Sequence, residues 1–237
     1  MLEQDIKEQL KGLFGQIQEK VELVYDESSH EDQKSLVEML TDVGSINPQV
    51  TAKISNKKSD VPHFVLHYKG KASGLSFRGI PGGHEFSTLV IAILNADGKG
   101  KQPDSNTIQR IRRLKGPIRI KTYVSLSCET CPDVVQALNQ MALLHEDFEH
   151  EIVDGGYAPA EISQLNIQGV PSIVTDSKLL YSWRIIFIDL LTKLEETFGT
   201  TKSEIPASQQ NLGHFDVVVI GGGPAGSTAA IYSARKG

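Results

Sequence analysis

Two cysteines, the only two among 237 residues, lie three residues apart in the segment Ser127-Cys128-Glu129-Thr130-Cys131-Pro132. Alternating apolar residues from Ile118 to Val124 predict a strand before them, and apolar residues at helical spacing after Pro132 predict a helix. Residues i and i+3 lie on one face of a helix, so two sulfurs placed there can form a disulfide bond. The unpaired amides and the dipole at a helix start also favour a thiolate. We therefore expect a redox-active pair at the start of a helix.

The same cysteines match the spacing of a zinc site in which His145 and His150 would be the other two ligands. A helix over Val134 to Leu144 would place His145 roughly 21 Å from Cys131, at about 1.5 Å per residue. Zinc holds its ligands at about 2.0 to 2.3 Å, so this distance argues against a metal site. A second alternative, two buried structural cysteines, does not explain their position at a helix start or the proline that follows.

Composition narrows the class of protein. A net charge of −5 argues against nucleic-acid binding, and the longest apolar run, Leu89 to Leu94, is too short to span a membrane. The first 17 residues predict an amphipathic helix whose acidic residues exclude a signal peptide. One cysteine pair, with no wider set of disulfides, suits a reducing compartment. We expect a cytoplasmic protein of one or two compact domains.

The two halves of the chain repeat one α/β pattern, and the first matching helices are offset by 98 residues. The offset aligns His30 and Gln33 with Cys128 and Cys131, so the first copy has no thiols. The matching segments are a helix at 36–43 and at 134–141, a strand opened by Val-Pro at 61–66 and at 170–174, and an apolar helix at 86–94 and at 185–194.

A strand, a Cys-x-x-Cys motif at a helix start and a later Val170-Pro171 resemble the thioredoxin fold, in which that proline is cis and flanks the disulfide. Two such folds, with thiols only in the second, resemble the N-terminal region of the bacterial alkyl hydroperoxide reductase flavoproteins. The stretch 127–139 is particularly similar, and the resemblance covers the whole chain. It implies an α/β protein with tandem thioredoxin-like folds at residues 1–115 and 116–198.

The C-terminal segment carries a dinucleotide-binding signature. Phe215 to Ile220 predict a buried strand, which leads into Gly221-Gly222-Gly223-Pro224-Ala225-Gly226 and a helix of small residues at 227–234. The acidic residue expected about twenty positions later is absent. We therefore expect a linker at 199–213 and, at 214–237, a truncated Rossmann-type β-α start of an FAD domain. Gly221, Gly223 and Gly226 would bind FAD only in an intact domain, and the tail should add nothing to the stability of the tandem unit.

The resemblance also implies a function. Electrons would pass from NADH through FAD and a second disulfide to Cys128–Cys131, and from there to an oxidised peroxiredoxin, in support of peroxide detoxification. Cys128 should be the exposed nucleophile with the lower pKa, and Cys131 should resolve the mixed disulfide. Pro171 would line the groove, with Glu129 and Thr130 as supporting residues. The chain alone should be a monomer without flavin or metal, whereas the full-length protein would use FAD and NADH and form a homodimer with no membrane or nucleic-acid partner.

The sequence departs from the thioredoxin pattern in two places. Thioredoxins place a buried acid six residues before the first cysteine, where this chain has Thr122. Glu85 is the candidate substitute, because the resembled family has a glutamate there facing the redox pair; the alternative is a solvated glutamate at a helix start. The turn at Tyr181-Ser182-Trp183-Arg184 lacks the small residues common there. Two other functions stay open, a general protein disulfide oxidoreductase and a non-catalytic docking module of a flavoprotein.

Overall fold

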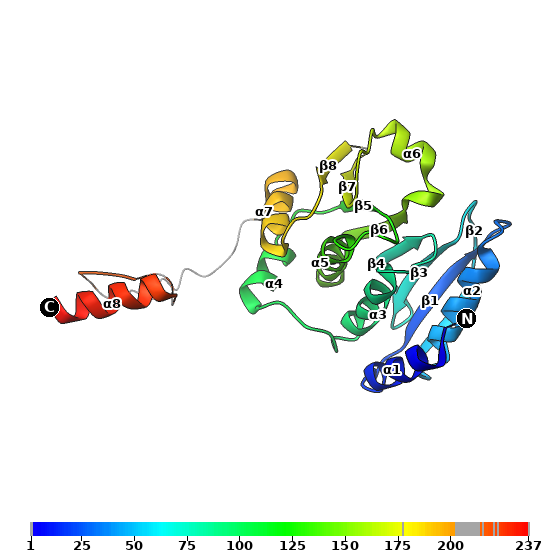
Figure 1. Ribbon diagram of the computed structural model, residues 1–237, viewed down its shortest axis with the longest axis horizontal. Coiled ribbons are helices and arrows are strands. Elements are labelled where there is room, and N and C mark those ends of the chain that lie inside the picture. The colour runs from blue at the N-terminus through cyan, green and yellow to red at the C-terminus, as the bar shows by residue number, and fades with distance from the viewer. Residues whose placement is uncertain are drawn as a thin grey trace. The chain divides into compact units, whose positions relative to one another are not determined.

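The computed structural model describes residues 2–176, 178–201, 214, 216–219, 221 and 223–236 (Figure 1). The chain divides into two compact units, residues 1–202 and residues 203–237, which are described separately.

One eight-stranded sheet, with the order β2-β1-β3-β4-β6-β5-β7-β8, forms the centre of the first unit (Figure 1). In each half a first strand pairs in parallel with the second and antiparallel with the third, and the third pairs antiparallel with the fourth. The strands are β1 (Val21–Glu27), β2 (Val50–Lys58), β3 (His63–Tyr68) and β4 (Lys71–Arg78), then β5 (Ile118–Val124), β6 (Phe148–Asp154), β7 (Ser172–Thr175) and β8 (Lys178–Ser182). This repetition is the tandem architecture that the 98-residue offset predicts.

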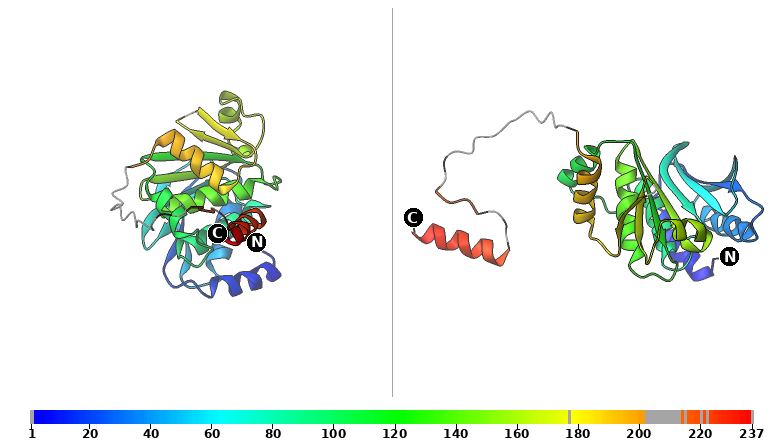
Figure 2. Two further views of the ribbon diagram at one scale, coloured as in Figure 1. Left: turned by 90° about the vertical axis from the view of Figure 1, so that its left-hand side faces the viewer. Right: turned by 90° about the horizontal axis from the view of Figure 1, so that it is seen from above.

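The two halves join edge to edge. Strands β4 and β6 pair in parallel, from Leu75 opposite His150 to Arg78 opposite Val153. The first half, blue to cyan, and the second, green to yellow, therefore lie side by side along one sheet (Figures 1 and 2). Because β4 and β6 are separated along the chain by β5, sequence periodicity does not reveal this junction.

Helices cover the sheet and bury the larger hydrophobic core. Central helices α3 (Glu85–Ala96) and α5 (Cys131–Leu144) pack against each other, one from each half. The others are α1 (Gln4–Phe14), α2 (Gln33–Gly44), α4 (Ser105–Arg112), the 3-10 turn η1 (Gly155–Tyr157), α6 (Pro159–Gln164) and α7 (Phe187–Phe198). A smaller core of Tyr123, Val153, Ala158 and Val174 packs with apolar residues in and after α6. None of the described helices is long and apolar enough to cross a membrane.

The second unit contains α8 (Pro224–Lys236), which confirms the predicted helix and extends it in both directions. The strand predicted at 215–220 is wrong for its described part, because Asp216 to Val219 adopt no strand conformation. A strand requires a neighbouring backbone to pair with, and no described residue pairs with this segment. Phe215 and Ile220 lie outside the described residues, as does the predicted linker from residue 202 to 213.

The start of the predicted linker pairs with the first unit. The amide of Lys115 donates a hydrogen bond to the Gly199 carbonyl at 3.1 Å, and the amide of Thr201 donates to the Arg113 carbonyl at 2.8 Å. Leu114 and Thr200 form an isolated antiparallel bridge between them. Residues 199–201 therefore extend the chain along the segment before β5.

Candidate disulfide-exchange site

A disulfide bond joins Cys128 and Cys131, whose Cα atoms lie 5.5 Å apart. Helix α5 begins at Cys131, with Thr130 as its N-cap residue and Pro132 in its first turn, where proline needs no hydrogen-bond acceptor. Cys128 therefore lies in the turn before the helix, and the expectation that both cysteines share a helix face is wrong. The chain at Ser125 to Thr130 forms turns because β5 must pass from the sheet to the helix above it.

The two sulfurs differ in environment. Cys131 is completely buried in the main core, whereas Cys128 is half-buried and reachable by a partner. The backbone amide of Cys131 donates a hydrogen bond to the Cys128 sulfur at 3.1 Å. An amide directed at a sulfur from the start of a helix stabilises the thiolate relative to the thiol. The geometry therefore favours Cys128 as the nucleophile.

Other predicted residues meet at this pair. The peptide bond between Val170 and Pro171 is cis, as expected, and the Val170 carbonyl oxygen lies 3.9 Å from the Cys128 sulfur. The Thr130 hydroxyl oxygen lies 3.7 Å from the same sulfur. Glu129 is exposed beside them. The described structure thus brings three separate elements, the turn after β5, the start of α5 and the start of β7, to one sulfur.

Glu85, the first residue of α3, is buried with only 1% of its surface exposed, so the alternative of a solvated side chain is wrong. Burial among apolar residues raises the pKa of Glu85 to about 7, and the nearby Thr88 hydroxyl offsets only part of this shift. A carboxyl group with this pKa gains and loses a proton near neutral pH. Such a group can act in proton transfer if it lies close to the thiols.

The start of α3 packs on the segment that leads to Cys128. The amide of His84 donates a hydrogen bond to the Leu126 carbonyl at 3.1 Å. Gly83 has a φ of +53°, and a Cβ atom on it would lie 2.4 Å from that same oxygen. Glu85, Val124 and Leu126 line one small cavity. The thiol-free half therefore contributes directly to the surroundings of the redox pair.

Sequence reasoning missed a buried polar network beneath α5. The side chain of Thr122 contacts His150 Nε2 at 2.8 Å, and His150 Nδ1 contacts Asn139 Oδ1 at 2.8 Å. An amide oxygen only accepts, so Nδ1 donates to Asn139 while Nε2 accepts from the Thr122 hydroxyl. Burial lowers the pKa of His150 to about 3. The network ties β6 to β5 and α5, the two elements that flank the turn with Cys128.

A signal for this network was present in the sequence. Phe148, His150 and Ile152 alternate along one strand, and alternation places all three on the same side of the sheet. The other histidine of the rejected zinc site, His145, contacts the Leu114 carbonyl through Nε2 at 2.9 Å. Both histidines therefore have protein partners away from the cysteines.

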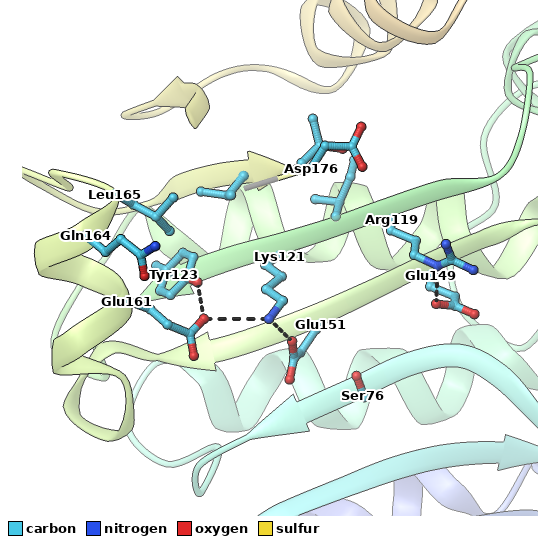
Figure 3. A pocket seen from close by; sticks show the side chains of 13 residues that line it. Ser76, Arg119, Lys121, Tyr123, Glu149, Glu151, Glu161, Gln164, Leu165 and Asp176 are labelled. Carbon is cyan, nitrogen blue, oxygen red and sulfur yellow. Dashed lines mark hydrogen bonds and ion pairs between the residues drawn. The ribbon is translucent and has the colours of Figure 1, made fainter. Parts of the chain in front are cut away.

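A charged pocket on the sheet was also not predicted (Figure 3). Tyr123 donates a hydrogen bond to Glu161 at 2.6 Å, and Lys121 bridges Glu151 at 3.2 Å and Glu161 at 3.6 Å. Arg78 binds Glu151 through two nitrogens and also pairs with Glu161. Burial and the neighbouring Glu161 raise the pKa of Tyr123. This network connects α6 to strands of both halves, which requires the β4–β6 junction.

Comparison with known proteins places these features in context. A family model described as a thioredoxin domain matches residues 118–191, which contain both cysteines and Pro171. The alkyl hydroperoxide reductase AhpF of Staphylococcus aureus strain Mu50 is 37% identical over 237 residues, covering 100% of this chain and 45% of the relative. The chain thus spans about half the length of the curated relatives that it matches.

Solved structures agree. The NTD_N/C domain of alkylhydroperoxide reductase AhpF from Enterococcus faecalis matches with a TM-score of 0.77 and 26% identity, covering 82% of this chain and 100% of that domain. A protein disulfide oxidoreductase from Aeropyrum pernix matches with a TM-score of 0.73 and 19% identity, covering 84% of this chain and 95% of that one, a likeness of fold alone. The expected tandem thioredoxin-like fold and the resemblance to the alkyl hydroperoxide reductase flavoproteins are confirmed.

Proposed function

We propose that this chain is the disulfide-reductase part of an AhpF-type alkyl hydroperoxide reductase and passes electrons through Cys128–Cys131 to an oxidised peroxiredoxin. One observation supports the proposal most strongly. A disulfide joins a half-exposed and a buried cysteine beside cis Pro171, in a chain similar from end to end to AhpF relatives. A reducing cytoplasm is the compartment in which such a pair would cycle.

The reaction is a two-step thiol–disulfide exchange. The Cys128 thiolate attacks one sulfur of the partner's disulfide, forms a mixed disulfide and releases the partner's other thiolate. The Cys131 thiolate then attacks the Cys128 sulfur, restores the Cys128–Cys131 bond and releases the second partner thiolate. Two electrons pass to the partner, whose thiolates take up two protons. A dithiol of the reducing module would regenerate the reduced pair by the reverse exchange.

Burial of Cys131 sets a requirement for the second step, because a buried thiol must lose its proton before it can attack. We infer that Glu85 accepts this proton. Its carboxyl group has a pKa of about 7, and its side chain lines a cavity with Val124 and Leu126. Replacing Glu85 by Gln keeps the shape and removes the proton acceptor. We expect slower resolution of the mixed disulfide and a changed thiolate titration, measured by ultraviolet absorbance across pH. An unchanged rate and titration would leave Glu85 a structural residue.

The proposal assigns FAD and NADH to the longer protein. Gly221 has a φ of +110°, and a Cβ atom on Gly226 would lie 2.1 Å from the Gly221 carbonyl oxygen. Gly221 therefore suits a tight turn before α8 and Gly226 a close packing of the first turn of α8 on it, where amides at a helix start can hold a pyrophosphate. Bound FAD would supply electrons taken from NADH. The exchange with the oxidised peroxiredoxin itself requires only the side chains of this chain and of that partner.

A trapping experiment tests the function. A Cys131→Ser variant keeps the nucleophile and cannot resolve, so it should accumulate a mixed disulfide with an oxidised peroxiredoxin. The matched Cys128→Ser variant should form none. Equal trapping of an unrelated disulfide protein such as insulin would favour a general protein disulfide oxidoreductase. No adduct with any disulfide protein would favour a docking module.

A further inference from the structure

Trp183 has an unusual backbone and surroundings beside the disulfide. It follows β8 with a φ of +80°, a conformation that residues other than glycine rarely adopt. Its side chain is 62% exposed, although it is a large aromatic group. The strained backbone opposes folding, the exposed ring contributes little to it, and strain of this kind concentrates at functional sites. Packing within the chain does not explain why a tryptophan stands here.

Three contacts fix the position of Trp183. Its amide donates a hydrogen bond to the Pro171 carbonyl at 2.8 Å. Its ring covers Gly169 so closely that a Cβ atom there would lie 2.6 Å from the indole. The next residue, Arg184, forms an ion pair at 3.0 Å with Asp133 in the first turn of α5. The indole is therefore held against the segment 169–171 and tied to the helix that carries Cys131.

The indole covers the segment that contacts the reacting sulfur. The ring lies on Gly169, and the carbonyl of the following residue, Val170, is 3.9 Å from the Cys128 sulfur. A mixed disulfide places the Cα atoms of its two cysteines about 5.5 to 6 Å apart, so the partner's backbone must cover the surface around Cys128. Residues next to the partner's cysteine then pass over the segment 169–171 and its indole.

We propose that Trp183 is a specificity-determining residue, which binds an apolar side chain adjacent to the reacting disulfide of a protein substrate. The inference rests on the proposed function and adds the chemistry by which the substrate is chosen. Aromatic rings provide a large contact area at low entropic cost and are frequent among residues that dominate binding. Arg184 is paired with Asp133, whereas the indole of Trp183 is exposed and can contact a partner.

Kinetics with two substrates of different size test the proposal. Trp183→Gly suits the positive φ, and Trp183→Phe keeps an aromatic ring. With an oxidised peroxiredoxin as substrate, Trp183→Gly should raise KM about tenfold with little change in kcat, and Trp183→Phe should recover most of the loss. Reduction of the small disulfide 5,5′-dithiobis(2-nitrobenzoate) should be unchanged in both. Ile54→Ala, which removes an exposed apolar side chain on β2, is the matched control and should change neither KM.

Two results would overturn the proposal. An unchanged KM for the protein substrate in Trp183→Gly would show that the indole makes no contact with it. An equal rise in KM for the small disulfide would show that Trp183 shapes the cysteine pair instead of recognising a partner. If the unmodified chain reduces the small disulfide but no peroxiredoxin, the proposed function fails separately, and the same KM comparison with insulin decides the role of Trp183. Trp183 is the only tryptophan, so its emission reports whether the site is intact in the unmodified chain and in the Ile54→Ala control.

Discussion

At the scale of residues, the chemistry follows from the difference between two sulfurs three positions apart. Cys128 is half-buried and accepts the amide of Cys131, whereas Cys131 is fully buried. The sequence predicted this division of roles because one cysteine precedes the other at a helix start. It did not predict that α5 begins only at Cys131, because the turn from β5 to the helix has no periodic pattern.

The first prediction concerns this difference. After full reduction, limiting iodoacetamide at neutral pH should modify Cys128 before Cys131, because the thiolate is the reactive form and Cys131 lies in the core. Peptide mapping by mass spectrometry measures the extent of modification at each of the two cysteines. Preferential modification of Cys131 would reverse the assigned roles.

A second prediction follows from two buried titratable groups with opposite shifts. The pKa of Glu85 rises from 4.5 to about 7 on folding, so folded Glu85 holds a proton that the unfolded chain releases, and stability falls as pH rises between those values. The pKa of His150 falls from 6.5 to about 3, so stability falls as pH drops between those values. Each slope is about 1.4 kcal/mol per pH unit, and the two cancel between about pH 4.5 and 6.5.

Glu85→Gln removes the pH dependence of stability that Glu85 contributes and leaves that of His150. Its free energy of unfolding, relative to the unmodified chain, should increase from pH 4.5 to 7 by up to about 3 kcal/mol. Urea denaturation at several pH values measures this difference. A constant difference across the range would mean that the carboxyl group of Glu85 titrates with an ordinary pKa in the folded protein.

At the scale of elements, the strands and helices that repeat at an offset of 98 residues could be read from apolar periodicity. The joining of β4 to β6 could not, because pairing between strands distant in sequence leaves no local pattern. The charged network of Arg78 with Glu151 and the packing of α3 on Leu126 both depend on that junction, and so both were missed. The predicted strand at 215–220 failed over its described part, residues 216–219, for the opposite reason: the apolar pattern is present, but none of the described strands pairs with it.

A third prediction concerns the contact between the two halves. Gly83→Ala places a Cβ atom 2.4 Å from the Leu126 carbonyl at a φ of +53°, so the start of α3 must move away from the segment before Cys128. We expect a loss of about 1 to 3 kcal/mol in stability and slower disulfide exchange. Gly98→Ala is the control, because Gly98 has a similar φ of +67° but no neighbouring atom within 4 Å. It should share the backbone strain and keep the exchange rate.

At the scale of the whole molecule, the thiol-free half packs against the segment that leads to Cys128. It supplies Glu85 and the contact with Leu126, while the second half supplies the cysteines, Pro171 and Trp183. The single sheet fixes the two halves relative to each other, so the surroundings of the disulfide are rigidly defined. A single thioredoxin-like fold of this sequence would lack the buried carboxyl group.

A fourth prediction concerns the end of the first unit. A chain ending at residue 201 should have the melting temperature of the whole protein, because residues 1–202 form one compact unit. A chain ending at residue 198 should melt several degrees lower, since it loses the hydrogen bonds of Gly199 and Thr201 with the segment 113–115. Equal melting temperatures for both would show that this pairing adds no stability.

The most direct test of the central claim is the rate at which the chain reduces an oxidised peroxiredoxin. Dithiothreitol serves as the electron source, and the rate is measured as the consumption of peroxide. The account predicts turnover with the unmodified chain and none above the dithiothreitol background with Cys128→Ser. Reduced Cys131→Ser, freed of dithiothreitol before mixing, should form one equivalent of mixed disulfide with the peroxiredoxin and then stop. Undiminished turnover by Cys128→Ser would show that electrons do not pass through this disulfide and would contradict the account.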